Sequence, residues 1–304
     1  MDFFIIFSDS VSPILIILGG AFIYNRLVYP DINDVARLSA SFFIPVMIFE
    51  TLTKFNVQFS DLVKPALFMF MYTATLLTLS YIIGKILKLG KDNRLYLMLT
   101  VSMINIGNFG LPLIYFTYGE AAISHSILYY IVFNIPLSTL AIYVLSDKST
   151  LKGFLVDIVK IPMFIIILIS LLFTSFLVEI PEALSRSLHL ISMAAIPLLI
   201  FVMGLQLSNI RFDFKLIPVI GLATLLRLCI SPFIAWFFLD ILDVGIIEKK
   251  IALVQTSSPS AMLPLIYAII FKRPTALLAA IIFSTTIFSS ITIPLIIMIL
   301  KGEL

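Results

Sequence analysis

The sequence predicts an all-α protein that crosses a membrane many times. Of its 304 residues, 61% are hydrophobic and only 12% are charged, and the mean hydropathy is +1.15. A soluble domain is about 45–50% apolar and about 25% charged. Apolar runs of about 20 residues, the length that a helix needs to span a bilayer, follow one another with short polar connections. The lipid bilayer is therefore the expected main partner, and nucleic acid is not expected.

Ten such runs are expected to form transmembrane helices. In chain order they cover residues 10–26, 36–53, 65–87, 95–118, 122–145, 158–178, 188–207, 216–239, 251–271 and 275–299. No soluble domain or long linker interrupts the series, and the connection at 146–157 is short. The function must therefore lie within the membrane.

The basic residues are divided unequally between alternate connections. About twice as many of the 20 Lys and Arg residues lie in one set of connections as in the other. The positive-inside rule then places the basic set in the cytoplasm and both termini outside the cell membrane. An even number of spans agrees with this topology.

Two segments of the chain recur at one fixed shift. The pentapeptide Leu-Pro-Leu-Ile-Tyr occurs at residues 111–115 and again at 263–267. In the second span, the dipeptides at 44–45 and 48–49 return at 196–197 and 200–201 in the seventh. Every shift is 152 residues (264 − 112), which indicates a duplicated unit. Residues 1–152 and 153–304 would each hold five spans. Because five is odd, the second copy starts on the opposite side of the membrane, so the repeat is inverted.

The fourth and ninth spans contain residues that interrupt a helix. The candidate substrate-binding residues are Asn105, Gly107, Asn108, Gly110 and Pro112 in the fourth span, and Gln255, Ser257, Ser258, Ser260 and Pro264 in the ninth. Proline removes a backbone donor and glycine permits conformations closed to other residues. Unwound backbone at membrane depth is tolerated only where protein or a water-filled cavity surrounds it. We therefore expect the two breaks to cross near the bilayer centre and form a binding site.

The ends of the half-helices give this crossing an electrostatic character. Half-helices beginning near Leu111 and Met262 would direct partial positive charge at the crossing and favour a carboxylate. The carbonyl ends of the preceding half-helices could equally hold a cation. The plainer alternative is a pair of kinked helices whose small residues permit close packing.

Each polar residue inside the other spans can be assigned one of two roles. Arg227 lies half-way along the eighth span, where it either clamps an anionic substrate or ties the freed carbonyls of the broken helices together. Glu50 is either the partner of Lys54 in an i,i+4 pair or a proton-coupling or gate residue. Asn134 and Gln206 either line a cavity or form interhelical hydrogen bonds.

Three motifs carry a resemblance to a known family. They are Asn105-x-Gly107-Asn108-x-Gly110-Leu111-Pro112, Met203-Gly204-Leu205 after Pro197, and Ser258-Pro259-Ser260 through Pro264. With them the chain resembles the auxin efflux carrier family, whose members include plant auxin exporters and prokaryotic permeases of malate, malonate and related acids. The resemblance covers essentially the whole chain. It implies a scaffold domain of spans one, two, six and seven, a mobile transport domain of spans three to five and eight to ten, an elevator-like motion, and a homodimer.

The chain also departs from the family pattern. Ser257 and Ser260 stand at the repeat positions of Asn105 and Asn108, so the second crossover lacks an amide pair. The short connection at 146–157 differs from the long loop of many plant members. The chain therefore resembles a compact prokaryotic form, for which auxin itself is not the expected substrate.

The leading hypothesis is a secondary transporter of a small organic anion, held where the breaks cross. The alternatives are a sodium-coupled symporter resembling the bile-acid type and a channel or sensor on the same scaffold. An enzyme is not expected, because the chain lacks paired intramembrane aspartates, an Asp-rich metal-diphosphate motif and a Gly-x-Ser-x-Gly motif. Two His and one Cys give no expected metal site. No cofactor is expected, and coupling to Na⁺ or H⁺ stays open.

Overall fold

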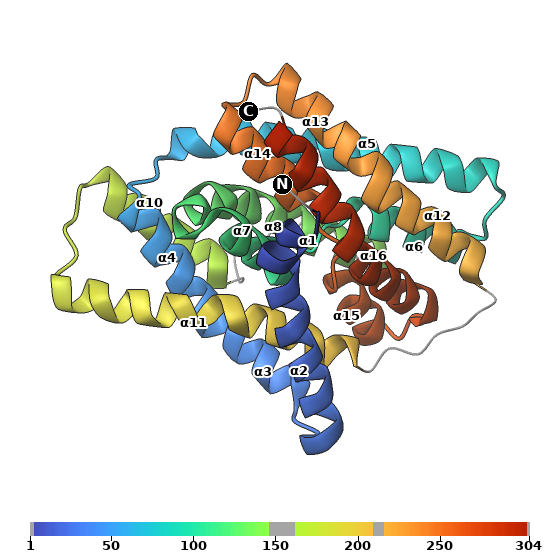
Figure 1. The fold of residues 1–304 in the computed structure, drawn as a ribbon, viewed down its shortest axis with the longest axis horizontal. Helices are drawn as coiled ribbons and strands as arrows, with labels where there is room; N and C mark the ends of the chain where they lie inside the picture. The colour runs from blue at the N-terminus through green and yellow to red at the C-terminus, as the bar shows by residue number, and fades with distance from the viewer. Residues whose placement is uncertain (1–2, 146–161, 209–215, 303–304) are drawn as a thin grey trace.

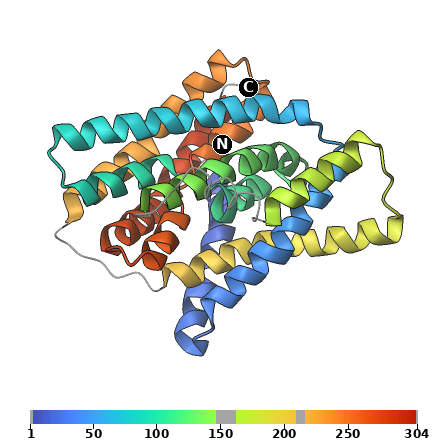
Figure 2. The ribbon, with the colours of Figure 1, turned by 180° about the vertical axis from the view of Figure 1, so that it is seen from behind.

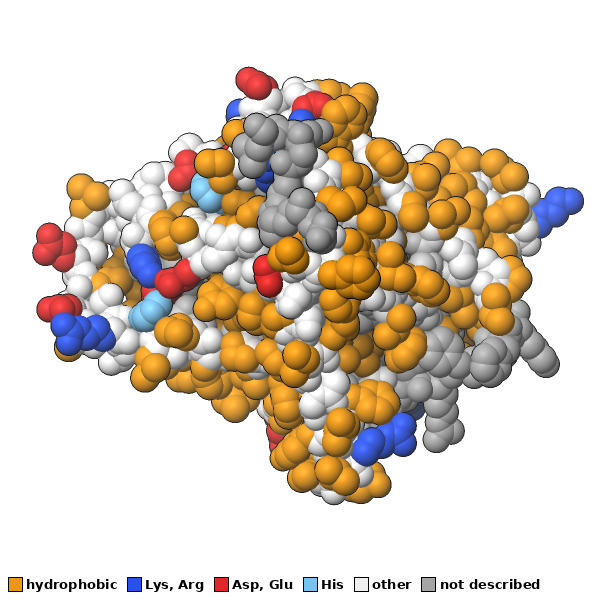
Figure 3. All heavy atoms as spheres, viewed as in Figure 1, with side chains coloured by type: hydrophobic (Ala, Val, Ile, Leu, Met, Phe, Trp, Pro, Cys, Tyr) orange, Lys and Arg blue, Asp and Glu red, His pale blue; other side chains and the backbone are white. Residues whose placement is uncertain are grey.

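The computed structural model describes residues 3–145, 162–208 and 216–302, and the regular secondary structure of this part of the chain is helical apart from one isolated β-bridge. The connection predicted at 146–157 lies outside the described residues. Helical segments long and apolar enough to cross a membrane are Phe3–Val28, Ile32–Lys54, Phe59–Ile86, Glu182–Leu207, Ile217–Ile241 and Ala276–Leu300. Hydrophobic side chains are spread over the whole face in Figure 3, with charged ones at scattered places among them. The prediction of an all-α, multi-pass membrane protein is confirmed at this level.

The elements of the first half follow the predicted runs. They are α1 (Phe3–Ile6), η1 (Phe7–Val11), α2 (Ser12–Val28), α3 (Ile32–Leu38), η2 (Ser39–Phe43), α4 (Ile44–Lys54), η3 (Phe59–Leu62), α5 (Val63–Ile86), α6 (Lys91–Ser102), η4 (Ile106–Gly110), α7 (Leu111–Tyr118), η5 (Glu120–Ala122) and α8 (Ile123–Leu145). The second half has α10 (Pro162–Ser175), α11 (Glu182–Leu207), α12 (Ile217–Leu225), η7 (Leu226–Ile230), α13 (Ser231–Ile241), α14 (Ile246–Thr256), α15 (Leu263–Ile270) and α16 (Ala276–Gly302).

Prolines explain the local widening of several helices. The π-helical segments η1, η2, η4 and η7 each end two residues before a proline, namely Pro13, Pro45, Pro112 and Pro232. A proline has no N–H, and its ring clashes with the carbonyl four residues earlier. A π turn, with its i→i+5 bonds, widens the helix there. These spans therefore continue past the proline instead of ending at it.

Two pairs of helices consist of segments too short to span a bilayer alone. Helix α6 ends at Ser102 and α7 begins at Leu111, while α14 ends at Thr256 and α15 begins at Leu263. The interruption predicted in each run is therefore present. Helix α7 begins at the predicted residue and α15 begins one residue after the predicted Met262. Both have eight residues, and their starts lie 152 positions apart (263 − 111).

The helices form two groups with the broken helices between them. Helices α2, α4, α10 and α11 pack against one another on one side, and α5, α12, α13 and α16 lie on the other (Figures 1 and 2). Helix α11 meets α2 backbone to backbone, because a Cβ added to Gly204 would lie 2.5 Å from the carbonyl oxygen of Leu18. Helix α7 and segment η4 contact α11, so the crossing sits against the first group.

Candidate functional site: the crossing of the broken helices

A short antiparallel bridge joins the two breaks. The amide of Asn105 donates to the carbonyl of Pro259 at 2.8 Å, and the amide of Ala261 donates to the carbonyl of Met103 at 2.8 Å. These bonds flank the bridge between Ile104 and Ser260. The breaks therefore satisfy each other's buried backbone groups.

The Ser260 side chain strengthens this junction. Its hydroxyl donates to the carbonyl of Thr100 at 2.7 Å, and its backbone amide donates to the Thr285 hydroxyl of α16 at 3.2 Å. Ser260 is completely buried. It therefore joins α6, the second break and α16, and its hydroxyl is occupied by a structural bond.

Arg227 lies behind the bridge and binds three carbonyl oxygens. Its Nε donates to Ser258 at 3.1 Å, its Nη1 donates to Val101 at 3.0 Å, and its Nη2 donates to Thr256. The side chain is completely buried, and its guanidinium lies 6.0 Å from the centre of the Tyr72 ring. Two roles were expected for Arg227, to clamp an anionic substrate or to link the freed carbonyls of the broken helices. The observed contacts are those of the second role.

A cavity of about 210 Å³ opens on the other side of the bridge. One wall is made by the N-terminal ends of two half-helices, residues 106–108 of η4 and 261–263 before and at the start of α15. Further lining residues come from α3, η2, α4, α8 and α11. Its polar lining residues are Ser39, Asn105, Asn108, Tyr130, Asn134 and Gln206, and none of its lining residues is a Lys, Arg, His, Asp or Glu. Two positive helix ends therefore face an uncharged cavity that is lined by apolar and polar residues together.

Several polar side chains at this cavity lack a strong hydrogen-bond partner. Within the described part of the chain, Ser39 Oγ and Gln206 Oε1 are buried without a hydrogen-bond partner. The side-chain amide of Asn105 donates to the Met203 sulfur at 3.3 Å, which is a weak acceptor. The side-chain amide of Asn134 donates to the backbone carbonyl of Tyr130 at 2.8 Å. Asn108 is half-buried. Unpaired buried polar groups of this kind are costly unless a ligand or water binds them.

The candidate residues divide into two sets. Asn105, Gly107 and Asn108 line the cavity. The others lie outside its lining: Gly110, Pro112, Gln255, Ser257, Ser258, Ser260, Pro264 and Arg227. Gln255 is completely buried, and its amide donates to the carbonyl of Ser126 at 3.1 Å. Gly110 lets Gln255 and Ser258 pack close, since an added Cβ would lie 3.1 Å from Gln255 Cγ and 3.3 Å from Ser258 Oγ.

The cavity also contains residues that the sequence did not assign to the site. Ser39 and Tyr130 were missed, although the small polar residues before Pro45 were a usable signal for Ser39. Asn134 and Gln206 were recognised as buried amides with two interpretations, and both line the cavity.

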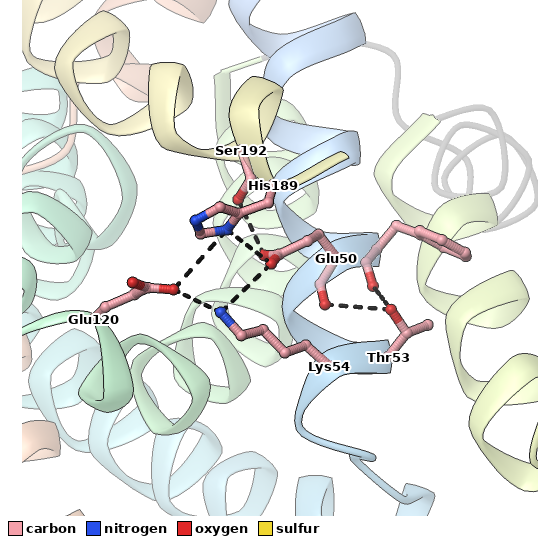
Figure 4. A network of polar contacts seen from close by, with 7 residues as sticks. Glu50, Thr53, Lys54, Glu120, His189 and Ser192 are labelled. Atoms are coloured by element: carbon pink, nitrogen blue, oxygen red, sulfur yellow. Dashed lines mark hydrogen bonds and ion pairs between the residues drawn. The ribbon is translucent and has the colours of Figure 1, made fainter. Parts of the chain in front are cut away.

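A second cavity, of about 250 Å³, lies toward the other end of α11 and is lined by Glu50, Glu120, His189 and Ser192 among others. Glu50 accepts from the Ser192 hydroxyl at 3.2 Å and lies 3.2 Å from His189 Nδ1 (Figure 4). The expected pair with Lys54 is present at 3.8 Å, but Lys54 Nζ lies nearer to Glu120, at 2.7 Å. This second partner has no local signal in the sequence, because Glu120 is 66 residues away.

Glu120 should make stability depend on pH. The Lys54 ammonium, by hydrogen bond and charge, lowers the pKa of the Glu120 carboxyl from its ordinary value of 4.5. A lowered folded-state pKa means that the stabilisation is present above pH 4.5 and is lost as the pH falls through the folded-state value. Glu120→Gln should therefore lower Tm slightly at pH 7, by less than about 1 kcal/mol of stability for so exposed a pair, and this deficit should disappear as the pH falls through the folded-state pKa of Glu120.

The matched control for this prediction is Glu182→Gln. Glu182 pairs with Arg186 within one exposed helix, and such a pair contributes only a few tenths of a kcal/mol. A Glu120→Gln protein whose Tm deficit at pH 7 does not shrink on acidification would contradict the assignment.

Comparison with known proteins agrees with the membrane fold. Residues 8–297 match the family model described as membrane transport protein. The chain is 30% identical over 261 residues to an uncharacterized transporter of Methanocaldococcus jannaschii, covering 83% of this chain and 84% of the relative. It is 27% identical over 288 residues to an uncharacterized transporter of Methanothermobacter thermautotrophicus, covering 93% and 94%. The chain therefore belongs to the membrane transport protein family, the auxin efflux carrier family that its motifs predict.

Proposed function

We propose that the protein is a secondary transporter of a small organic anion, whose carboxylate binds in the cavity of about 210 Å³ at the crossing. The observation that carries this proposal is the pair of half-helix N-termini lining that cavity. Each helix N-terminus is equivalent to about +0.5 charge, so the two together match one carboxylate. Asn108 and Gln206 supply side-chain groups that fix its orientation.

The proposed architecture is ten spans in two inverted repeats, residues 1–152 and 153–304. The equal lengths of α7 and α15 and their starts 152 positions apart support the duplication. The basic connections support a topology with both termini outside a cell membrane. As in the family it resembles, the chain would act as a homodimer.

We further propose an elevator-like motion. Both cavities lie on one seam, where α4 and α11 meet the elements of the fourth and fifth spans. The proposed scaffold of spans one, two, six and seven corresponds to α2, α4, α10 and α11, which pack together. Sliding of the remaining spans along this seam would expose the crossing first to one cavity and then to the other.

A thermal-shift screen of the purified protein against small carboxylates tests the site. A ligand that binds only the folded state raises Tm, and saturable counterflow of the best hit in proteoliposomes would establish transport. Asn108→Ala should weaken the hit's binding about tenfold or more, because hydrogen bonds to charged groups contribute about 1.5–3 kcal/mol.

Asn33→Ala is the control, because Asn33 is an exposed amide residue outside the cavity and its backbone bond to Asp31 is retained. This variant should bind the hit like the wild type. If Asn108→Ala and Asn33→Ala bind the hit equally well, the carboxylate does not bind in this cavity.

A further inference from the structure

Four helix ends meet at the crossing, and they divide by sign. The two N-terminal ends, of η4 and α15, line the cavity. The two C-terminal ends, of α6 at Ser102 and α14 at Thr256, lie on the side of Arg227. Negative and positive ends of the broken helices are thus separated by the backbone bridge.

The charge of Arg227 matches that of the two C-terminal ends. Each C-terminus is equivalent to about −0.5 charge, so the pair offsets one guanidinium. Within the described residues Arg227 forms no ion pair, and the only buried carboxylate is Glu50, which contacts His189, Ser192 and Lys54. An unpaired buried cation costs several kcal/mol. The carbonyl ends of α6 and α14 are therefore the counter-charge of Arg227.

We propose that Arg227 is a resident cation in the place that a coupling cation would otherwise take, so that the protein works without sodium. In crossed-helix transporters, unwound carbonyls and half-helix C-termini are the groups that hold Na⁺. Here the guanidinium already binds three such carbonyls, of Val101, Thr256 and Ser258. The inference rests on the proposed function only in treating the crossing as the centre of a transporter.

The remaining free oxygens near the crossing do not suit a cation. Ser126 Oγ, Gln255 Oε1 and Ser258 Oγ are buried without partners among the described residues. All three are uncharged, and Ser258 also accepts from Arg227 through its carbonyl at 3.1 Å. A sodium ion at this point would lie close to a full positive charge with no carboxylate to offset it. An uncharged donor such as water suits these oxygens better.

The first experiment compares cations on the wild type. Tm is measured in NaCl, KCl and choline chloride at equal ionic strength, and should be the same in all three. Flux of a carboxylate hit in proteoliposomes should likewise persist when choline replaces sodium. A Tm that rises specifically and saturably with sodium, or a flux that requires sodium, would overturn the proposal.

The second experiment removes the guanidinium group of Arg227 by mutation and adds free guanidinium ion to the solution. Arg227→Ala should lower Tm, and millimolar guanidinium should restore part of the loss, with a gain that grows with the logarithm of its concentration. Choline should not restore it, since it cannot donate to the three carbonyls. The wild type should show no such gain.

The matched control is Leu226→Ala, a cavity-forming change at a buried neighbour in η7. It should lower Tm without any recovery in guanidinium. Equal responses of Arg227→Ala and Leu226→Ala to guanidinium would overturn the resident-cation assignment. If Arg227→Ala does not fold, Arg227→Lys takes its place: it keeps the charge but loses the planar fork, and should remain indifferent to sodium.

These Tm measurements need no substrate, so they separate the resident cation from the anion site. A failed carboxylate screen with successful guanidinium rescue would leave Arg227 as the resident cation and remove only the anion site. A successful carboxylate screen with a sodium-dependent Tm would support the anion site and overturn the assignment of Arg227 as the resident cation.

Discussion

Gly204→Val is expected to destabilise the folded protein strongly. Even the first side-chain carbon would lie 2.5 Å from the carbonyl oxygen of Leu18, 2.7 Å from the Cβ of Ala21 and 3.1 Å from the Cα of Leu18. Two of these atoms are backbone, so no rotamer change can relieve the contact. Helix α2 would have to move away from α11, at a cost of about 1–3 kcal/mol or more.

The measurement is Tm in detergent for Gly204→Ala and Gly204→Val, with Gly20→Ala as the control. Gly20 lies in α2, and a Cβ added there meets nothing within 4 Å. Replacing a helical glycine by alanine at such an open position should be neutral or stabilising by up to about 1 kcal/mol. If Gly204→Ala is as stable as Gly20→Ala, the close α2–α11 contact does not exist.

Gly107→Ala is expected to have the largest effect on ligand binding. Its new methyl group would lie 2.7 Å from Cε2 of the Tyr130 ring, and both residues line the crossing cavity. The ring must move, and a shift into a space of about 210 Å³ removes volume that the ligand needs. Overpacking of about 1–3 kcal/mol corresponds to an affinity loss of about fivefold to more than a hundredfold.

A second substitution shows whether the ring is responsible. Tyr130→Leu in the Gly107→Ala background shortens the side chain and should restore part of the affinity for the hit. Tyr130→Phe in the same background keeps the colliding ring edge and should restore none. Gly107→Ala with wild-type affinity would show that the ligand does not occupy this cavity.

The breaks could be predicted from the sequence because proline and glycine act locally. Pro112 and Pro264 mark the starts of α7 and α15 to within one residue of the expected positions. The contacts between elements could not be predicted in the same way. The three acceptors of Arg227 are backbone carbonyls, which every residue has, so no residue type in the sequence indicates them.

The residues of the candidate site that lie in the break could be predicted from the sequence, and those that packing brings to it could not. Asn105, Gly107 and Asn108 occupy the cavity wall because they lie in the break before Pro112, which the sequence predicts directly. The helical turn that follows the break begins at Ile106, before the expected start near Leu111. Ser39 and Gln206 reach the same cavity from η2 and α11, elements that only the packing brings to the crossing. Ser260 resembles a ligand residue in the sequence, but its hydroxyl is bonded to Thr100.

The wide π turn at residues 106–110 also fixes the rotational phase of the half-helix that follows it. A π turn holds one residue more than an α turn, and one residue corresponds to about 100° around a helix axis. With this extra residue, Gly107 and Asn108 face the cavity while Leu111 and Leu113 are completely buried. A chain one residue shorter here would turn α7 by more than a quarter of a rotation. The number of residues in the break, as well as their identity, therefore determines which side chains reach the crossing.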